Sequence, residues 1–140
     1  MPKQDEKVKK KILVVDDESA FVEMIKMRLE ASDYEVVTAS NGKEGLSQVK
    51  AQKPDVVLLD IMMPEMDGLS VLKEIRSQDK KLPVYMLTAF SDSERFKMAS
   101  QLNASGFIVK TKDLKEQVKN ITSALSMSDR YKGKGDSPHA

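Results

Sequence analysis

Four apolar stretches of the sequence end in side chains that can take part in chemistry. Asp16 and Asp17 follow the first stretch, Asp60 ends the second, Thr88 ends the third and Lys110 ends the fourth. Carboxylate oxygens are ligands that Mg²⁺ prefers, and bound Mg²⁺ also accepts phosphate oxygens. A lysine and a hydroxyl group suit the oxygens of a phosphoryl group, and a carboxylate can attack phosphorus to give an aspartyl phosphate. If they meet in space, these residue types predict a metal-assisted phosphoryl acceptor.

Asp60 is the first candidate among them, because it ends the most apolar stretch. Val56-Val57-Leu58-Leu59 leads directly into it, and a loop with Pro64 and Gly68 follows. A short, continuously apolar run between turn residues is typical of a central parallel strand that is buried on both faces. A carboxylate at the end of such a strand is costly unless it reaches water, a metal or a cation. We therefore expect Asp60 to lie at the centre of the chemistry.

The rest of the chain supplies the elements that would bring these residues together. Apolar runs predict strands over residues 11–15, 34–39, 56–60, 83–88 and 106–110. Helical spacing of apolar residues predicts helices over 19–31, 41–52 and 113–125, a third helix with Leu69, Leu72 and Ile75 inward, and a fourth that begins at 91–93 with Phe96, Ala99 and Leu102 inward. This alternation predicts an α/β fold, a doubly wound five-stranded parallel sheet with helices on both faces. The candidate side chains should then share one edge of the sheet.

Composition limits the class of protein further. The chain has 140 residues, a formal charge of +1 and no cysteine, so we expect one domain without disulfides or thiolate zinc sites. We expect a flexible basic arm over 1–10, one domain over 11–126, and a disordered tail or the start of a linker over 127–140. No apolar stretch resembles a signal peptide or a membrane span. The expected protein is cytoplasmic, without membrane insertion and without direct nucleic-acid binding.

The residues quoted so far resemble a known family in both type and order. The matching segments are Ile12–Glu18, Asp60–Gly68, Leu87–Ala89 and Lys110. From about Lys10 to Leu125 the chain resembles the receiver domains of two-component response regulators, and in particular the single-domain chemotaxis receivers. The resemblance implies a flavodoxin-like (βα)5 fold with strand order 2-1-3-4-5.

The resemblance also implies a role for each acidic residue. Asp60 would accept a phosphoryl group from a histidine kinase or a histidine phosphotransfer protein. Asp17 would bind Mg²⁺ directly and Asp16 largely through water, while the backbone carbonyl of Met62 would be a further ligand. The domain would promote only its own phosphorylation and dephosphorylation, and would not be an enzyme that acts on other substrates.

Three further positions carry the switch that the resemblance implies. Thr88 would move to hydrogen-bond the phosphoryl group, and Lys110 would pair with it. Phe107 would rotate inward as Thr88 moves, and a downstream protein would read the change on the face formed by the fourth helix, fifth strand and fifth helix, around Phe96 and Lys115. Only about fifteen residues follow the last predicted helix, so we expect either a single-domain regulator or a piece of a longer protein.

One position departs from the family pattern. Receivers usually carry a proline after the lysine, in a cis peptide bond, whereas Thr111 stands here. A cis bond before a residue other than proline costs about 3 kcal/mol. We therefore predict a trans Lys110–Thr111 bond and a shifted loop. Phe107 is a smaller departure, because it lacks the hydroxyl group of the commoner tyrosine.

Several alternatives compete with these interpretations. The acidic triplet Asp16-Asp17-Glu18 could be a solvated helix cap, and Phe107 could be ordinary packing at the edge of the sheet. A dinucleotide-binding domain would need glycines where this triplet stands, so that alternative fails. A phosphatase of the haloacid dehalogenase kind would need a second acid two residues after Asp60, where the sequence has Met62, so that alternative is weak. The main rival is a receiver-like module that binds partners without being phosphorylated.

Overall fold

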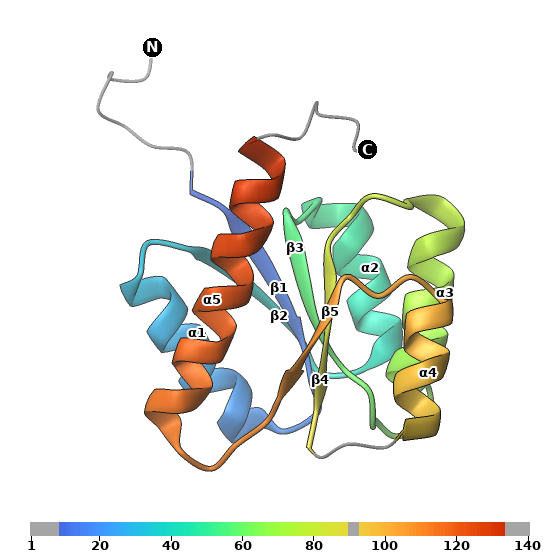
Figure 1. Cartoon of the computed structure of the whole chain (residues 1–140), viewed down its shortest axis with the longest axis horizontal. Helices are drawn as coiled ribbons and strands as arrows, with labels where there is room; N and C mark the ends of the chain where they lie inside the picture. Colours follow the sequence, from blue (N-terminus) through green and yellow to red (C-terminus); the bar gives the residue numbers. More distant parts are fainter. Residues whose placement is uncertain (1–8, 90–92, 134–140) are drawn as a thin grey trace.

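The computed structural model describes residues 9–89 and 93–133, with side chains described as far as Met127. Five strands alternate with five helices along the chain (Figure 1). The strands are β1 Lys11–Val15, β2 Glu35–Ala39, β3 Val56–Asp60, β4 Val84–Thr88 and β5 Gly106–Val109. The helices are α1 Ser19–Ala31, α2 Gly42–Gln52, α3 Gly68–Gln78, α4 Ser93–Gln101 and α5 Leu114–Gly133.

The strands form one parallel sheet in the order β2-β1-β3-β4-β5, which confirms the predicted fold class and strand order. The order reverses direction between β1 and β3, and a ligand crevice is expected at such a switch point. In the register of the sheet, Val15 pairs with Leu59 and Asp60 pairs with Leu87. Asp16 and Asp60 therefore leave two neighbouring strands at the same edge.

Helices cover both faces of the sheet, with α1 and α5 on one side and α2, α3 and α4 on the other (Figure 1). Successive residues of each strand pack alternately against the two layers of helices. Leu13 and Leu59 pack toward α2, α3 and α4, whereas Ile12 and Leu58 pack toward α1 and α5. All four of these side chains are completely buried. The central strands are thus apolar on both faces, as buried parallel strands require.

Two expectations about the helices are wrong. Helix α5 continues to Gly133, so residues 127–133 are helical and do not belong to a disordered tail. The stretch after Leu125 contains no glycine or proline before Gly133, and its polar residues are compatible with a helix, so nothing in the backbone ends α5 earlier. Residues 1–8, 90–92 and 134–140, which include most of the predicted arm, the start of the fourth helix and the rest of the tail, lie outside the described residues.

Phe96 is the second correction. Ala99 is buried and Leu102 packs against the core as predicted, but 46% of Phe96 is exposed. The α4 helix covers the edge of the sheet, where Phe96 stacks on Phe107 of β5 instead of entering the core. Within the described part of the chain, no helix is both long and apolar enough to cross a membrane.

Candidate functional site

Three carboxylates meet at the edge of the sheet where β1 and β3 end. One oxygen atom from each of Asp16, Asp17 and Asp60 lies within 4.8 Å of the others. Asp16 and Asp60 are buried, whereas Asp17 is exposed to solvent. The chain brings them together because β1 and β3 are parallel neighbours that end at the same level. The structure thus brings together the predicted acidic residues.

Backbone amides satisfy one oxygen atom of each buried carboxylate. The amide of Glu18 donates to Oδ1 of Asp16 at 2.9 Å, and the amide of Met62 donates to Oδ1 of Asp60 at 3.2 Å. The second oxygen of Asp16, Oδ2, is fully buried, and the ammonium of Lys110 lies 2.7 Å from it. A buried anionic oxygen of this kind is costly without a cation, and Lys110 is the cation that faces it here. The three carboxylates also supply the all-oxygen donor set that a hard cation prefers.

Asp60 has an unusual protonation equilibrium in this setting. Burial and the neighbouring Asp16 carboxylate raise the pKa of Asp60 from 3.8 to about 7, although Lys110 and the amide of Met62 oppose the change. The raised pKa has two causes, loss of hydration and repulsion between like charges. A cation bound between the carboxylates would remove the repulsion. Without a bound cation, ionisation of Asp60 is therefore less favourable than ionisation of an exposed aspartate.

Lys110 extends from the end of β5 into the same cluster. Its Nζ atom lies 2.7 Å from Oδ2 of Asp16, 2.6 Å from Oε1 of Glu18 and 3.5 Å from Oδ2 of Asp60. The ring of Phe21 on α1 lies 4.6 Å from the ammonium, within cation–π distance. Burial acts to lower the pKa of Lys110, but the three carboxylates outweigh it and raise the pKa. Lys110 is therefore cationic, and its ammonium lies nearer to Asp16 and Glu18, on the β1–α1 side, than to Asp60.

Thr88 completes the predicted set at the end of β4. It pairs with Val109 of β5, and its carbonyl accepts a hydrogen bond of 2.7 Å from the amide of Lys110. Thr88 and Lys110 are thus fixed to each other across two strands. Every peptide bond in the described ranges is trans, including Lys110–Thr111, which confirms the prediction made from Thr111.

The loop after β3 is tightly packed against the strand end. The amide of Gly68 donates to the carbonyl of Ile61 at 2.8 Å, and a Cβ atom added to Gly68 would lie 2.1 Å from the carbonyl oxygen of Asp60. Only glycine permits this approach. Met62 lies in the same loop with 57% of its surface exposed. The role of its carbonyl as a metal ligand stays a prediction.

The predicted switch residue Phe107 lies on β5, outside the acidic cluster. Phe107 is half-buried, and its ring stacks on that of Phe96 with centroids 3.8 Å apart and an angle of 25°. The pair joins β5 to α4 at the sheet edge. Movement of Phe107 would therefore change a surface that α4 shares.

Sequence reasoning missed two residues that contact this site. The sequence places Glu18 only in an acidic run, whereas in the structure its carboxylate binds Lys110. The sequence predicts no role for Gln117, yet this residue is fully buried on α5 and hydrogen-bonds on both sides of Lys110. A signal for Gln117 was present, because it lies three residues after Leu114 and four before Ile121, on the apolar face of its helix.

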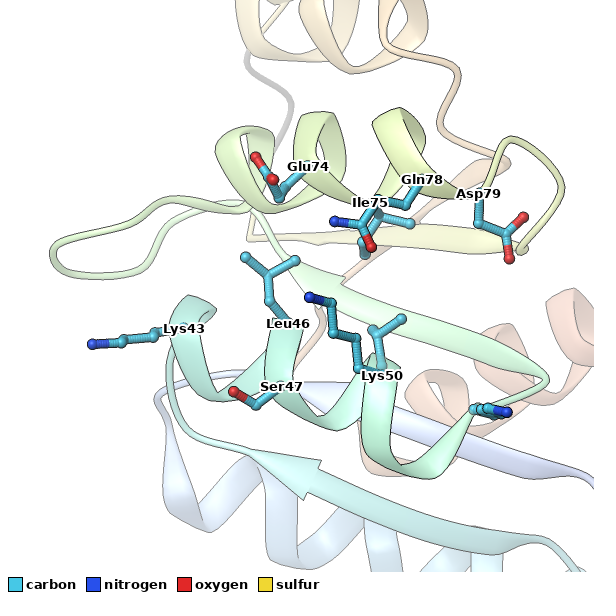
Figure 2. A pocket seen from close by; sticks show the side chains of 10 residues that line it. Lys43, Leu46, Ser47, Lys50, Glu74, Ile75, Gln78 and Asp79 are labelled. Atoms are coloured by element: carbon cyan, nitrogen blue, oxygen red, sulfur yellow. The ribbon is translucent and has the colours of Figure 1, made fainter.

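A groove of about 520 Å³ lies elsewhere on the molecule, between α2 and α3. Figure 2 shows Leu46 and Ile75 facing each other across it, with Lys43 and Lys50 on the α2 side and Glu74 on the α3 side. None of the predicted site residues lines this groove. This groove is therefore separate from the acidic cluster.

Comparison with known proteins agrees with this geometry. The response regulator receiver domain family matches residues 12–122. The chain is 38% identical over 120 residues to the alkaline phosphatase synthesis transcriptional regulatory protein PhoP of Bacillus subtilis, covering 86% of this chain and 50% of PhoP. It is 40% identical over 126 residues to the probable transcriptional regulator ycf27 of Guillardia theta, covering 90% of this chain and 49% of that protein. The chain thus spans about half the length of these curated relatives.

Solved structures show the same likeness. The chemotaxis protein CheY4 of Vibrio cholerae superposes with a TM-score of 0.78 at 30% identity, covering 86% of this chain and 99% of that one. NtrX of Brucella abortus superposes with a TM-score of 0.80 at 29% identity, covering 92% of this chain and 29% of NtrX. The sequence match, the strand order and the acidic edge agree, and the chain belongs to the receiver domains of two-component response regulators.

Proposed function

We propose that Asp60 is the residue that accepts the phosphoryl group. The observation that carries this proposal is its position: Asp60 ends the central strand, within reach of two other carboxylates and 3.5 Å from the ammonium of Lys110. A carboxylate oxygen of Asp60 attacks the phosphorus atom of a phosphohistidine. The phosphorus–oxygen bond forms, the phosphorus–nitrogen bond breaks, and its electron pair stays on the histidine nitrogen.

Mg²⁺ is the cation that fits the acidic cluster best. The three carboxylates are hard oxygen ligands that lie within 4.8 Å of one another, and Asp17 is open to solvent. Asp16, Asp17 and Asp60 would hold the ion, with the carbonyl of Met62 as the further ligand that the family resemblance implies. Bound there, the ion would offset the negative charge that the carboxylates and the incoming phosphoryl group bring together.

Lys110 and Thr88 stabilise the phosphoryl group from the opposite side. Nζ of Lys110 needs to move only a short distance from its present partners to reach an oxygen bonded to Asp60. The hydroxyl group of Thr88 donates a hydrogen bond to another phosphoryl oxygen once β4 adjusts. Positive charge and a hydroxyl donor are the groups that phosphoryl transfer requires.

The modified state favours a second conformation of the face formed by α4, β5 and α5. As Thr88 moves toward the phosphoryl group, Phe107 moves inward and its stack with Phe96 is rearranged. The partner that reads this change is a downstream protein that contacts the surface around Phe96, Phe107 and Lys115. The donor is a histidine kinase or a histidine phosphotransfer protein. A cytoplasmic location and the absence of activity on other substrates stay predictions of the sequence.

A receiver-like module that is never phosphorylated is the weaker alternative. Such a module has no need to keep an acid pair, an acceptor, a hydroxyl group and a lysine at one edge. Here the three carboxylates lie together, Lys110 lies 3.5 Å from Asp60, and Thr88 ends the strand between them. Thr111 was the one feature in its favour, and the loop that contains Thr111 still delivers Lys110 to Asp16 and Asp60.

Intact-mass measurement with acetyl phosphate as the donor tests the proposal. We expect one added phosphoryl group in the presence of Mg²⁺, none after removal of Mg²⁺ by chelation, and none on Asp60→Asn. Glu30→Gln, an exposed acid on α1, is the matched control and should be modified like the parent. An unmodified parent that nevertheless binds Mg²⁺ would support the unphosphorylated module instead.

A further inference from the structure

Gln117 is a buried polar residue on the apolar face of α5. It is 0% exposed, and it lies between the buried or half-buried residues Leu114 and Ile121 on the same face of the helix. Burial of a carboxamide is unfavourable unless its donor and acceptor are both satisfied. The identity of the two partners therefore shows what the residue holds in place.

The carboxamide of Gln117 bridges the two residues that flank Lys110. Its Oε1 atom accepts a hydrogen bond of 2.8 Å from the amide of Thr111, and its Nε2 atom donates one of 3.3 Å to the carbonyl of Val109. The amide of Lys110 itself donates to the carbonyl of Thr88 at 2.7 Å. The backbone on both sides of Lys110 is thus tied to one side chain of α5, and Lys110 is tied to β4.

This bridge depends on the residue that replaces the usual proline. Proline has no amide N–H, so only a residue such as Thr111 can donate to Oε1 of Gln117. The trans loop is also closed locally: Oγ1 of Thr111 accepts from the amide of Asp113 at 3.2 Å, and Oδ1 of Asp113 accepts from the amide of Glu116 at 3.2 Å. Thr111 and Gln117 therefore act as a pair that fixes a loop without proline.

We propose that Gln117 is a positioning residue for Lys110, because it holds the backbone on both sides of Lys110 in a loop that has no proline. The proposal rests on the function proposed above, in which Lys110 binds the phosphoryl group on Asp60. The ammonium of Lys110 reaches its partners at the end of a flexible side chain, so the position of its backbone decides which oxygen atoms it can reach. Displacement of a catalytic group by about 1 Å can slow a reaction by about a hundredfold.

The consequence is specific, because Gln117 contacts only one side of the site. Within the described residues its side chain hydrogen-bonds to Val109 and Thr111, whereas the acidic residues lie at the ends of β1 and β3. Loss of the bridge should therefore slow phosphoryl transfer without weakening Mg²⁺ binding. A purely structural role in the core would not separate the two quantities.

The test compares Gln117→Met, which keeps the length of the side chain and removes both hydrogen bonds, with Ile121→Val. Ile121 is a fully buried neighbour on α5, and its apolar side chain cannot hydrogen-bond to Lys110 or to the residues that flank it. With acetyl phosphate as the donor, we expect Gln117→Met to be phosphorylated about tenfold more slowly than the parent, with its Mg²⁺ affinity undiminished. Ile121→Val should react at the parental rate. Equal rates for Gln117→Met and the parent would overturn the proposal.

Amide hydrogen exchange of the unmodified parent protein tests the bridge itself, even if Gln117→Met does not fold. The amide of Thr111 should exchange slowly, and the amide of the exposed Lys112 should exchange fast. In Gln117→Met the Thr111 amide should lose its protection, while that of Ile61, bonded to Leu87 at 3.1 Å, should keep it. An unprotected Thr111 amide in the parent would refute the bridge. A parent that takes up no phosphoryl group would instead refute the proposed function, so the two failures are distinct.

Discussion

The ammonium of Lys110 lies 2.7 Å from Asp16, nearer than its distance of 3.5 Å from Asp60. In the unmodified protein Lys110 is thus paired with a predicted metal ligand and with Glu18, and is only beside the acceptor. A new phosphoryl group on Asp60 brings two or more negative oxygens into reach of the same ammonium. Transfer of Lys110 from the β1–α1 side to the phosphoryl group is therefore part of the switch that we propose.

Lys110→Met tests the contribution of that charge. The variant keeps most of the side-chain volume but cannot bind the phosphoryl group, so phosphorylation by acetyl phosphate should slow by about a hundredfold. The matched control is Lys115→Met, which removes an exposed lysine of α5 and should leave the rate unchanged. A normal rate for Lys110→Met would show that the ammonium serves only to neutralise the carboxylates.

Asp60→Asn should stabilise the metal-free protein at neutral and alkaline pH. The pKa of Asp60 is 3.8 in the reference state and about 7 in the fold. The folded state therefore favours protonated Asp60, so its stabilisation is fully present below pH 3.8 and is lost as the pH rises through about 7. Ionisation of Asp60 therefore lowers the free energy of unfolding by at most about 4 kcal/mol, a value that includes its interactions with Asp16 and Lys110. Urea unfolding at several pH values should show a gain for Asp60→Asn near pH 8 that shrinks toward pH 4; a constant gain would contradict the assignment.

Mg²⁺ should stabilise the protein through the acidic cluster. At a concentration of ten times the dissociation constant, binding to the folded state alone contributes about 1.4 kcal/mol. Thermal unfolding should therefore occur at a higher temperature in Mg²⁺ than in chelator, and Asp17→Asn should remove most of this shift. Glu30→Gln, which removes an exposed acid from α1, should keep the full shift. A shift that survives in Asp17→Asn would place the ion elsewhere.

Gly68→Ala should damage the site through the backbone of Asp60. The added Cβ atom would lie 2.1 Å from the carbonyl oxygen of Asp60, so the loop or the strand end must move. Overpacking of this kind costs about 1–3 kcal/mol, and here the phosphorylation rate should fall as well. In Gly106→Ala the added atom meets the ring of Tyr85 at 2.9 Å, a side chain that can shift. This control should lose less stability and keep its rate.

Much of this account could be predicted from the sequence because burial on two faces leaves a strong local signal. The run ending in Asp60 had to be a central strand, and parallel strands that end in Asp16, Asp60, Thr88 and Lys110 had to share an edge. The trans bond before Thr111 followed from the cost of a cis bond without proline. These inferences needed only the order of residues along the chain.

The features that were missed depend on contacts between distant segments. Glu18 and Lys110 are 92 residues apart, so their pairing follows only from the meeting of β1 and β5 ends in space. The partners of Gln117 are backbone atoms of a loop whose path the sequence does not specify. Helical spacing identifies the apolar face of a helix but not what packs against that face. Phe96 was therefore expected to point into the core, whereas its ring stacks on that of Phe107 on β5.

The identity of the modified residue is the most direct test of the central claim. After phosphorylation with acetyl phosphate and Mg²⁺, borohydride reduction converts an aspartyl phosphate to homoserine, which peptide mass spectrometry can locate. We predict homoserine at position 60 in the parent and nowhere in Asp60→Asn. Homoserine at Asp16 or Asp17, or a phosphoryl group that resists reduction, would contradict the account.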